Sequence, residues 1–293
     1  MTDSDKMPGR RDERLAAVFR DKPEMVIGLP EWMLPAEQAD AYRRMDDLAV
    51  VEIAGRDAIA AAVRGVEEHG YGNLLPVYAY TGSEHGPWDS IPRAVKRLAE
   101  RLPRVRVHPL LVIGSPGFWR AINGRFVGDL IRLFGHYTPC TGCHLYLHAV
   151  RIPLARKIGN VSVIAGERKS HSGSVKINQV GPALDFYGRF LDSFGIRLHL
   201  PVADVADGKQ IETILEMPWE RGKEQPGCCL SGNYRTAAGD MALETESVMR
   251  YFIDFAGPAT RKIISAYLED RVPDHEAFAA AVIKGRDAEG RAR

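Results

Sequence analysis

The chain has 293 residues, of which 45% are hydrophobic and 26% are charged, and its formal net charge is +1. This length can bury a full hydrophobic core, in one elaborated domain or two small ones. No apolar run approaches the roughly 20 residues that a membrane-spanning helix needs. The first residues, MTDSDKMPGRRDER, are charged where a signal peptide would be apolar. We therefore expect a cytoplasmic protein that does not contact a membrane.

The hydrophobic pattern predicts strands that alternate with helices. Residues 1–45 read as an N-terminal arm and lead-in, with residues 1–20 too charged to pack. An α/β domain is expected over 46–235 and a C-terminal helical extension over 236–293. The expected strands are 48–53, 74–80, 105–113, 161–165 and 196–201, and the expected helices are 58–68, 91–101, 117–134, 145–158, 182–194, 241–255 and 259–268, followed by a charged tail. Such alternation predicts a five-stranded parallel sheet covered by helices on both faces.

Three unusual loops follow expected strands. They are Ala54-Gly55-Arg56-Asp57, residues 81–90 and residues 166–176, and they are rich in Gly, Ser, His and basic residues. In an open parallel sheet the ligand site lies beyond the carboxyl ends of the strands, where helix N-termini offer free N–H groups. The loops therefore predict a site for an anionic ligand.

The four cysteines form two pairs, Cys140 with Cys143 and Cys228 with Cys229. The stretch "CTGCH" has the spacing of a c-type haem attachment site, but also suits zinc, a redox dithiol or an iron–sulfur cluster. Covalent haem attachment and disulfides both belong outside the cytoplasm, which disfavours them here. Clustered cysteines in a chain without others indicate metal ligands, with buried apolar thiols as the alternative.

The segment from Ile91 to Asn160 is strongly basic. It contains two acidic residues, Glu100 and Asp129, against twelve basic ones: Arg93, Lys96, Arg97, Arg101, Arg104, Arg106, Arg120, Arg125, Arg132, Arg151, Arg156 and Lys157. Such an excess favours an anionic partner such as a nucleotide or RNA. A solvated surface balanced by acidic residues elsewhere is the alternative.

The strand followed by "IAGRDA" and a helix resembles the pyrophosphatase loop of the PP-loop ATPase superfamily, the adenine-nucleotide α-hydrolase-like branch of the HUP fold, whose motif is SGGxDS. Gly55 and Asp57 stand at the second glycine and the aspartate, whereas Ile53, Ala54 and Ala58 replace the first serine, first glycine and last serine. The resemblance implies a five-stranded HUP/Rossmann-like sheet, ATP as ligand and Mg²⁺ held with the help of Asp57.

A second likeness involves Gly166-Glu167-Arg168 followed by Ser170, which is similar to the Gly-x-Arg substrate loop of sulfonucleotide-reductase relatives. With the positions near it, this implies a nucleotide site made of Ala54, Gly55, Arg56, Asp57, Thr81, Gly82, Gly166, Arg168, Ser170 and Lys176. The residues expected to take part in catalysis are Asp57, Lys169 and His171. His85 lies near the same site.

The cysteines resemble those of PP-loop enzymes that thiolate tRNA bases, in which a CxxC and a distal cysteine hold a [4Fe-4S] cluster. Carried over, the ligands are Cys140, Cys143 and Cys228, with Cys229 as the alternative third ligand. Zn²⁺ is the competing metal, as in relatives that make a deazaguanine nitrile. His144 and His148, at i and i+4 of a helix, could flank either metal.

The resemblance implies an ATP-dependent sulfur-inserting enzyme that adenylates a carbonyl oxygen of a tRNA base or a small molecule and then thiolates it. A sulfur donor would be its partner, and a homodimer is one assembly that we consider. One alternative is a zinc-containing PP-loop ligase of the deazaguanine-nitrile synthase type. The other is a nucleotide-binding or metal-sensing protein without turnover, suggested by the missing hydroxyls at Ile53 and Ala58.

Overall fold

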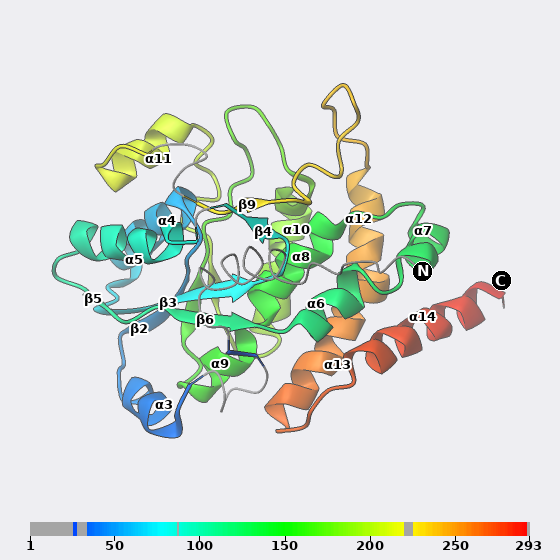
Figure 1. Cartoon of the computed structure of the whole chain (residues 1–293), viewed down its shortest axis with the longest axis horizontal. Coiled ribbons are helices and arrows are strands. Elements are labelled where there is room, and N and C mark those ends of the chain that lie inside the picture. The colour runs from blue at the N-terminus through cyan, green and yellow to red at the C-terminus, as the bar shows by residue number, and fades with distance from the viewer. Residues whose placement is uncertain (1–25, 28–33, 87, 220–224, 292–293) are drawn as a thin grey trace, which may run out of the picture.

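The computed structural model describes residues 26–27, 34–86, 88–219 and 225–291 of the chain (Figure 1). The expected arm over residues 1–20 lies outside the described residues. None of the described helices combines the length and the apolar character that crossing a membrane requires.

A parallel sheet forms the centre of the molecule, as the sequence predicts. Its main strands stand in the order β6-β3-β2-β7-β8, which is the Rossmann-like order 3-2-1-4-5. The two-residue strand β1 pairs with β6 at one edge. The bounds are β1 Val26–Ile27, β2 Leu48–Glu52, β3 Asn73–Tyr80, β6 Leu111–Gly114, β7 Ser162–Ile164 and β8 Leu198–His199.

The expected strand over 105–113 is in fact two short strands, β5 (Arg106–Val107) and β6, which pair with the start and the end of β3. Leu74 pairs with Val107, whereas Val77 pairs with Leu111, so the connection holds one extra residue. Pro109 in that connection has no N–H to donate to a ladder. The strand is therefore interrupted there, and β6 pairs with β3 in a register that is shifted by one residue relative to β5.

The two faces of the sheet bury different side chains, because successive residues of a strand point to opposite sides. On one face Val51, Leu74 and Ile164 pack under α4 (Arg56–His69), α5 (Ser90–Arg101) and α11 (Gly208–Leu215). On the other face Val50, Leu75 and Val163 join a larger core. That core takes residues from α3 (Ala36–Arg43), α6 (Pro116–Asn123), α7 (Val127–Phe134), α8 (Pro139–Ala149), α9 (Ile152–Lys157), α10 (Gly181–Asp192) and the C-terminal helices.

Between residues 117 and 158 the helices differ in part from the sequence prediction. The single helix expected over 117–134 is two, α6 and α7, because Gly124 ends the first. The helix expected over 145–158 must bend at Pro153 according to the sequence, and the structure divides it near that residue into α8 and α9. The CTGCH stretch is not a turn before a helix: Thr138 is the N-cap of α8 and Pro139 its first residue, so both cysteines lie on the helix.

The C-terminal part is more helical than expected. Helix α12 (Thr245–Tyr251) continues through a π-helical turn (Phe252–Ala256) into α13 (Gly257–Leu268). The expected charged tail is instead helix α14 (His275–Arg291). Its start is fixed by Asp274, whose carboxylate accepts a hydrogen bond from the Ala277 N–H at 2.9 Å, and Ala279 and Ile283 are buried in the larger core. The division of the chain at residue 236 stays a prediction.

Candidate nucleotide and metal site

A cavity of about 600 Å³ opens beyond the carboxyl ends of β2, β3 and β7, a size within the usual range of ligand pockets. The loop after β2, from Ile53 to Ala58, forms one wall, and the loop after β3 forms another. Glu167, His171 and Lys176 come from the loop after β7. All three unusual loops therefore meet at one cavity, the place where Rossmann-like sheets bind ligands.

The start of α4 faces this cavity without a side-chain cap. Gly55 is its N-cap and contributes no side chain, so the first N–H groups of the helix remain without an intrahelical partner. A Cβ atom on Gly166 would lie 2.5 Å from the Ala58 nitrogen, so only glycine lets the loop after β7 approach this closely. Free N–H groups and the positive end of the helix dipole favour an anion such as phosphate.

Arg168 holds these two loops together rather than facing the ligand space. Its side chain is 1% exposed, and Nη1 contacts both carboxylate oxygens of Asp57 at 3.3 Å. Nε and Nη2 each donate to a backbone carbonyl, of Val205 and Ala206, at 2.7 Å. All three nitrogens of the guanidinium group therefore have protein partners. Arg168 positions Asp57 at the edge of the cavity.

Lys176 supplies a free cation to the cavity. Its side chain is half-buried, and no residue in the described parts of the chain forms a hydrogen bond or ion pair with its ammonium group. Burial lowers the pKa of Lys176, against the opposing effect of Glu167 and Asp57. Arg56 also lines the cavity, but it contacts Glu212 at 3.2 Å. Lys176 is therefore the cation best placed to neutralise an anionic ligand.

One face of α8, continued by Arg151 at the start of α9, carries the side chains of the opposite wall. Residues three and four apart share a helix face. Cys140, Cys143, Leu147 and Arg151 follow this spacing, as do His144 and His148. The cavity is lined by Cys143, His144, Leu147 and Arg151. The CxxCH stretch is thus the first part of a stripe that runs along the helix into the site.

A short antiparallel pairing brings the third cysteine to the same place. Strand β9 (Gly227–Cys228) pairs with β4 (Glu84–His85), and Cys228 stands opposite Glu84. The Cys228 Sγ lies 3.2 Å from the Ser83 hydroxyl. Cys228, Cys140 and Cys143 together line a second cavity of about 120 Å³ that adjoins the first. Cys229 is exposed and lines neither cavity.

Burial and neighbouring thiols act on two of these thiols, those of Cys140 and Cys143. Burial raises the pKa of Cys140 to about 11, and the neighbouring Cys228 adds to the increase. Burial also raises the pKa of Cys143, with Cys228 and Cys140 contributing. Because thiolates bind metals, a cationic metal would have to displace these protons. Three soft ligands around one small cavity fit a thiophilic metal or an iron–sulfur cluster.

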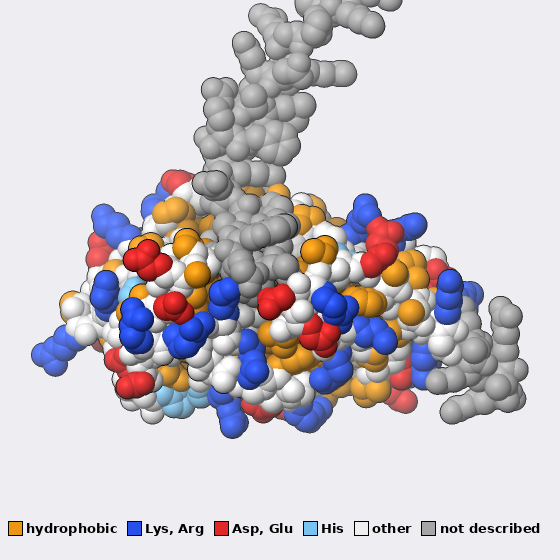
Figure 2. All heavy atoms as spheres, turned by 90° about the horizontal axis from the view of Figure 1, so that it is seen from below, with side chains coloured by type: hydrophobic (Ala, Val, Ile, Leu, Met, Phe, Trp, Pro, Cys, Tyr) orange, Lys and Arg blue, Asp and Glu red, His pale blue; other side chains and the backbone are white. Residues whose placement is uncertain are grey.

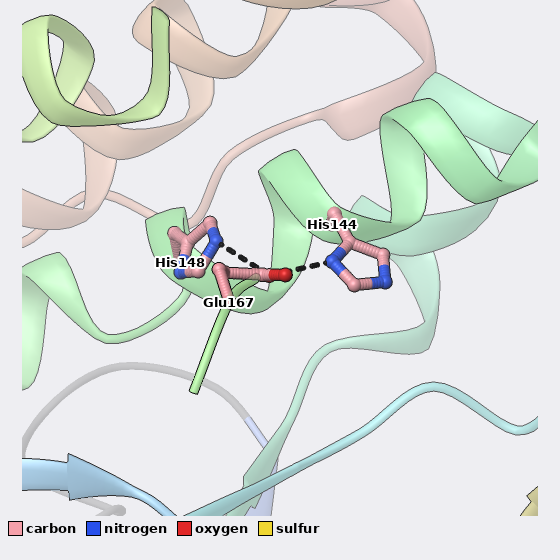
Figure 3. A group of neighbouring side chains, drawn as sticks. All are labelled: His144, His148 and Glu167. Carbon is pink, nitrogen blue, oxygen red and sulfur yellow. Dashed lines mark hydrogen bonds and ion pairs between the residues drawn. The ribbon is translucent and has the colours of Figure 1, made fainter. Parts of the chain in front are cut away.

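A network of buried charges forms the floor of the large cavity. The side chain of His148 is 0% exposed and lies between two carboxylates, 3.3 Å from Glu52 and 3.2 Å from Glu167. Glu52 also contacts Arg151 at 3.2 Å, and Glu167 contacts His144 at 2.7 Å (Figure 3). Burial alone would raise the pKa values of both carboxyl groups, but these cations outweigh it and leave both below their ordinary values.

Comparison with known proteins places the chain in a family. No family model matches the sequence. Over 228 residues it is 34% identical to the uncharacterized protein MJ0009 of Methanocaldococcus jannaschii, a match that covers 75% of this chain and 81% of that protein. The chain belongs to the MJ0009 family. A solved structure, the U34-tRNA thiolase NcsA from Methanococcus maripaludis with its [4Fe-4S] cluster, is similar at a TM-score of 0.39 and 13% identity, over 86% of this chain and 78% of that one.

In this member of the MJ0009 family, most of the sequence-predicted site residues lie together. Those that line the large cavity are Ala54, Gly55, Arg56, Asp57, Thr81, Gly166, His171, Lys176, Cys143 and Cys228. Cys140 lines the adjoining one. Gly82, Arg168, Lys169 and Ser170 line neither cavity. Lys169 is half-exposed and forms an ion pair with Asp204 at 2.7 Å, which leaves it at the surface.

Sequence reasoning missed several polar residues of this site. Glu52, Glu84, Arg151 and Gln179 line the large cavity, and Glu167 was given no role of its own. Glu84 accepts hydrogen bonds from the N–H groups of Thr81 and Gly82 at 2.7 and 2.8 Å, so it shapes the loop after β3. A signal was available for two of them: Glu52 ends an otherwise apolar strand, and Arg151 is a charge inside the apolar pattern of the helix expected over 145–158.

Proposed function

We propose that this protein is an ATP-dependent sulfur-inserting enzyme. The observation that carries the proposal is that one cavity joins the uncapped start of α4, suited to phosphate, to the thiols of Cys143 and Cys228. A nucleotide bound at the helix start would therefore present its phosphates toward the cysteines. Lys176, unpaired among the described residues, lies in the lining of both cavities.

In the first step, a carbonyl oxygen of the substrate attacks the α-phosphorus of ATP. An O–P bond forms, the bond to the bridging oxygen breaks, and pyrophosphate leaves with the electron pair. The N–H groups at the start of α4 and the Lys176 ammonium stabilise the charge on the departing phosphates. Asp57, held by Arg168, would supply a carboxylate for Mg²⁺, an ion that proteins bind through one or two carboxylates and the phosphates. His171 lines the same cavity, with its ring nitrogen 3.9 Å from Asp57, and we assign it proton transfer to or from the bound substrate.

In the second step, the sulfur of a hydrosulfide donor attacks the adenylated carbon. A C–S bond forms, the C–O bond breaks, and AMP leaves with the electron pair. A [4Fe-4S] cluster, when bound by Cys140, Cys143 and Cys228, would supply an open iron position for the hydrosulfide, because three thiolates leave one iron without a protein ligand. The roles of the three cysteines are to hold that group and to face it toward the nucleotide.

Three thiolates by themselves suit either an iron–sulfur cluster or a zinc ion that takes a fourth ligand. Cys140, Cys143 and Cys228 line one cavity, and the remaining cysteine, Cys229, does not. We place the cluster first because three thiolates leave one iron open to a sulfur donor, which the proposed reaction needs. The zinc ligase of the nitrile-forming type is the alternative.

The basic segment from Ile91 to Asn160 does not by itself select an RNA substrate. Several of its arginines have acidic partners from elsewhere in the chain: Arg93 pairs with Asp89, Arg101 with Glu216, and Arg120 and Arg125 with Glu276. Figure 2 shows a face on which Lys and Arg side chains lie among Asp and Glu. We therefore keep two substrate classes, a tRNA base and a small carbonyl compound, and the test below separates them.

The test is preparation of the full chain without air, followed by measurement of iron, acid-labile sulfide and visible absorption. We expect about four irons and four sulfides per chain, as one [4Fe-4S] cluster requires. Cys228→Ser should lose most of the iron. Cys229→Ser is the matched control, because the exposed neighbouring thiol lines neither cavity, and it should retain the iron.

The same preparations are incubated with ATP and Mg²⁺, with and without tRNA, and pyrophosphate is measured. Release that depends on added tRNA indicates the RNA substrate, and release that depends on a small carbonyl compound indicates the other class. Asp57→Asn should lower the rate at least about tenfold. A protein without iron, whose zinc is lost in Cys228→Ser, would contradict the proposal and favour the ligase.

A further inference from the structure

We propose that His144, His148 and Glu167 form a second metal site, which binds a divalent transition-metal ion of the zinc class in the floor of the large cavity. The site is separate from the cysteines and does not depend on the proposed sulfur chemistry. Its three ligand atoms, one from each residue, all lie within 4.8 Å of one another (Figure 3). Among the described residues, no other three His, Cys, Asp or Glu side chains bring their ligand atoms this close together.

The distances suit ligands that share one ion. His148 Nε2 lies 3.2 Å and His144 Nδ1 lies 2.7 Å from the same oxygen of Glu167. Two ligands of a tetrahedral zinc ion, each about 2.1 Å from the metal, are about 3.4 Å apart. His148 Nε2 is buried and lies 3.2 Å from Glu167, yet it has no hydrogen bond of acceptable geometry. A buried polar atom without such a bond is rare, and a metal ion shared with Glu167 would give this nitrogen a partner.

The residue types and their spacing are those of a known kind of zinc site. His144 and His148 stand at i and i+4 on α8, so both rings lie on one face of the helix, and Glu167 approaches from the loop after β7 (Figure 3). Two histidines and one carboxylate are a ligand set of catalytic zinc, which leaves the fourth position for water or substrate. Histidines at this spacing on one helix bind zinc in other proteins.

Outer groups hold the ligands in place. Glu52 lies 3.3 Å from His148 Nδ1, the ring nitrogen that would not bind the metal, and Arg151 fixes Glu52. Gln179 donates a hydrogen bond to the other oxygen of Glu167, and His171 contacts Gln179 at 2.6 Å. Metal-binding histidines almost always have such a partner on the second nitrogen. The arrangement therefore continues beyond the three ligands.

The ion would face the ligand space. His144 and Glu167 both line the large cavity, so the fourth coordination position opens toward bound substrate. A metal there could polarise a carbonyl oxygen or lower the pKa of a bound water molecule. The site would thus place a Lewis acid beside the carbonyl group of whichever substrate the cavity accepts.

The test uses the full chain with all four cysteines replaced by Ser, so that no thiolate can bind the probe. The protein is cleared of metal with a chelator and titrated with Co²⁺, which reports its ligands through visible absorption. We expect one Co²⁺ per chain, absorption of a four-coordinate site without thiolate charge transfer, and displacement by Zn²⁺. Glu52→Gln, which removes an outer partner, should weaken Co²⁺ binding about 10- to 100-fold.

His144→Asn is the main variant because its side chain is 26% exposed, and it should weaken Co²⁺ binding more than Glu52→Gln does. His85→Asn, on an exposed residue outside both cavities, is the matched control and should bind normally. If circular dichroism shows that the serine variant is unfolded, the same Co²⁺ titration is carried out on the wild-type chain. Co²⁺ at the cysteines then shows thiolate charge-transfer absorption, whereas Co²⁺ at the His144 site does not, so the two sites can be told apart. Absence of stoichiometric Co²⁺, or unchanged affinity in His144→Asn, overturns the site. Iron content of the wild-type chain tests the cysteines separately.

Discussion

At the scale of single residues, the site depends on charges placed inside apolar segments. Glu52 stands at the end of a strand whose other residues are fully buried and apolar, and Arg151 is 1% exposed among apolar helix residues. A buried charge is costly unless paired, so each of these positions predicts a partner. The sequence shows that partners are needed, but it cannot show that Glu52 meets both Arg151 and His148, because those contacts depend on the packing of α8 against the sheet.

A histidine away from the site gives a prediction about pH. Burial, together with the nearby positive charges of His69 and Arg197, lowers the pKa of His199 from 6.5 to about 4. The Tyr71 hydroxyl lies within hydrogen-bond distance of His199 Nε2, at 3.1 Å. As the pH falls from 6.5 toward 4, the unfolded chain gains a proton on this ring before the folded chain does, so the free energy of unfolding decreases.

We therefore expect the free energy of unfolding to decrease less in His199→Gln than in the wild type as the pH falls over this range. The difference should be about 1 kcal/mol, allowing for the screening of a partly exposed side chain. Urea unfolding of both proteins near pH 6.5 and near pH 4 measures it, and the titration of other groups cancels in the comparison. Parallel losses in the two proteins would contradict the assignment.

At the scale of elements, the sequence is informative about periodic segments and less so about their interruptions. The five main strands and their parallel arrangement are as predicted, because apolar runs and helical spacing identify elements well. The break between α6 and α7 and the split of the third strand depend on single residues, Gly124 and Pro109. The pairing of β4 with β9, which brings Cys228 to the site, joins segments too short and too far apart in sequence to be recognised.

The contact between the loop after β7 and the start of α4 can be tested at Gly166. A Cβ atom there would lie 2.5 Å from backbone atoms of Asp57 and Ala58, which cannot move as a flexible side chain could. We expect Gly166→Ala to destabilise the protein by about 1–3 kcal/mol and to weaken ATP binding, because the start of α4 must shift.

Gly128→Ala is the matched control for this substitution. Gly128 is exposed on α7, and nothing lies within 4 Å of an added Cβ atom. Alanine should therefore stabilise that helix by about 0.5–1 kcal/mol. Urea unfolding measures the free energy of both variants, and calorimetric titration measures ATP binding. Equal stability of the two variants would show that the loop does not approach α4 this closely.

At the scale of the whole molecule, the C-terminal helices share one core with the sheet. Phe252 and Phe255 of the π-helical turn are buried with Tyr187 of α10 and Tyr146 of α8. The rings of Phe252 and Phe186 stack with centroids 4.9 Å apart. The sequence predicts these helices but not the surface that they cover, because an apolar helix face does not indicate which element it packs against.

This shared core predicts that the described part of the chain unfolds as one unit. Phe252→Ala should lower the free energy of unfolding by about 3–5 kcal/mol, and tryptophan fluorescence and far-ultraviolet circular dichroism should still report the same midpoint. Ile253→Ala, on a neighbouring side chain that is 60% exposed, should have little effect. Two separate transitions, of which Phe252→Ala moves only the first, would contradict a common core.

The pairing of β4 with β9 has a consequence for stability that goes beyond placing one thiol. Cys140 and Cys143 lie on a helix of the main core, whereas Cys228 lies on a two-residue strand held at one side by β4. A metal group bound by all three would act as a cross-link that closes a long loop of the chain, and closing a loop reduces the entropy of the unfolded state. Binding of the metal group by the cysteines would then also lower the fraction of time during which the segment around Cys228 is detached from α8. Proteolysis after Lys and Arg residues near Cys228, such as Arg235, would be faster in the metal-free chain.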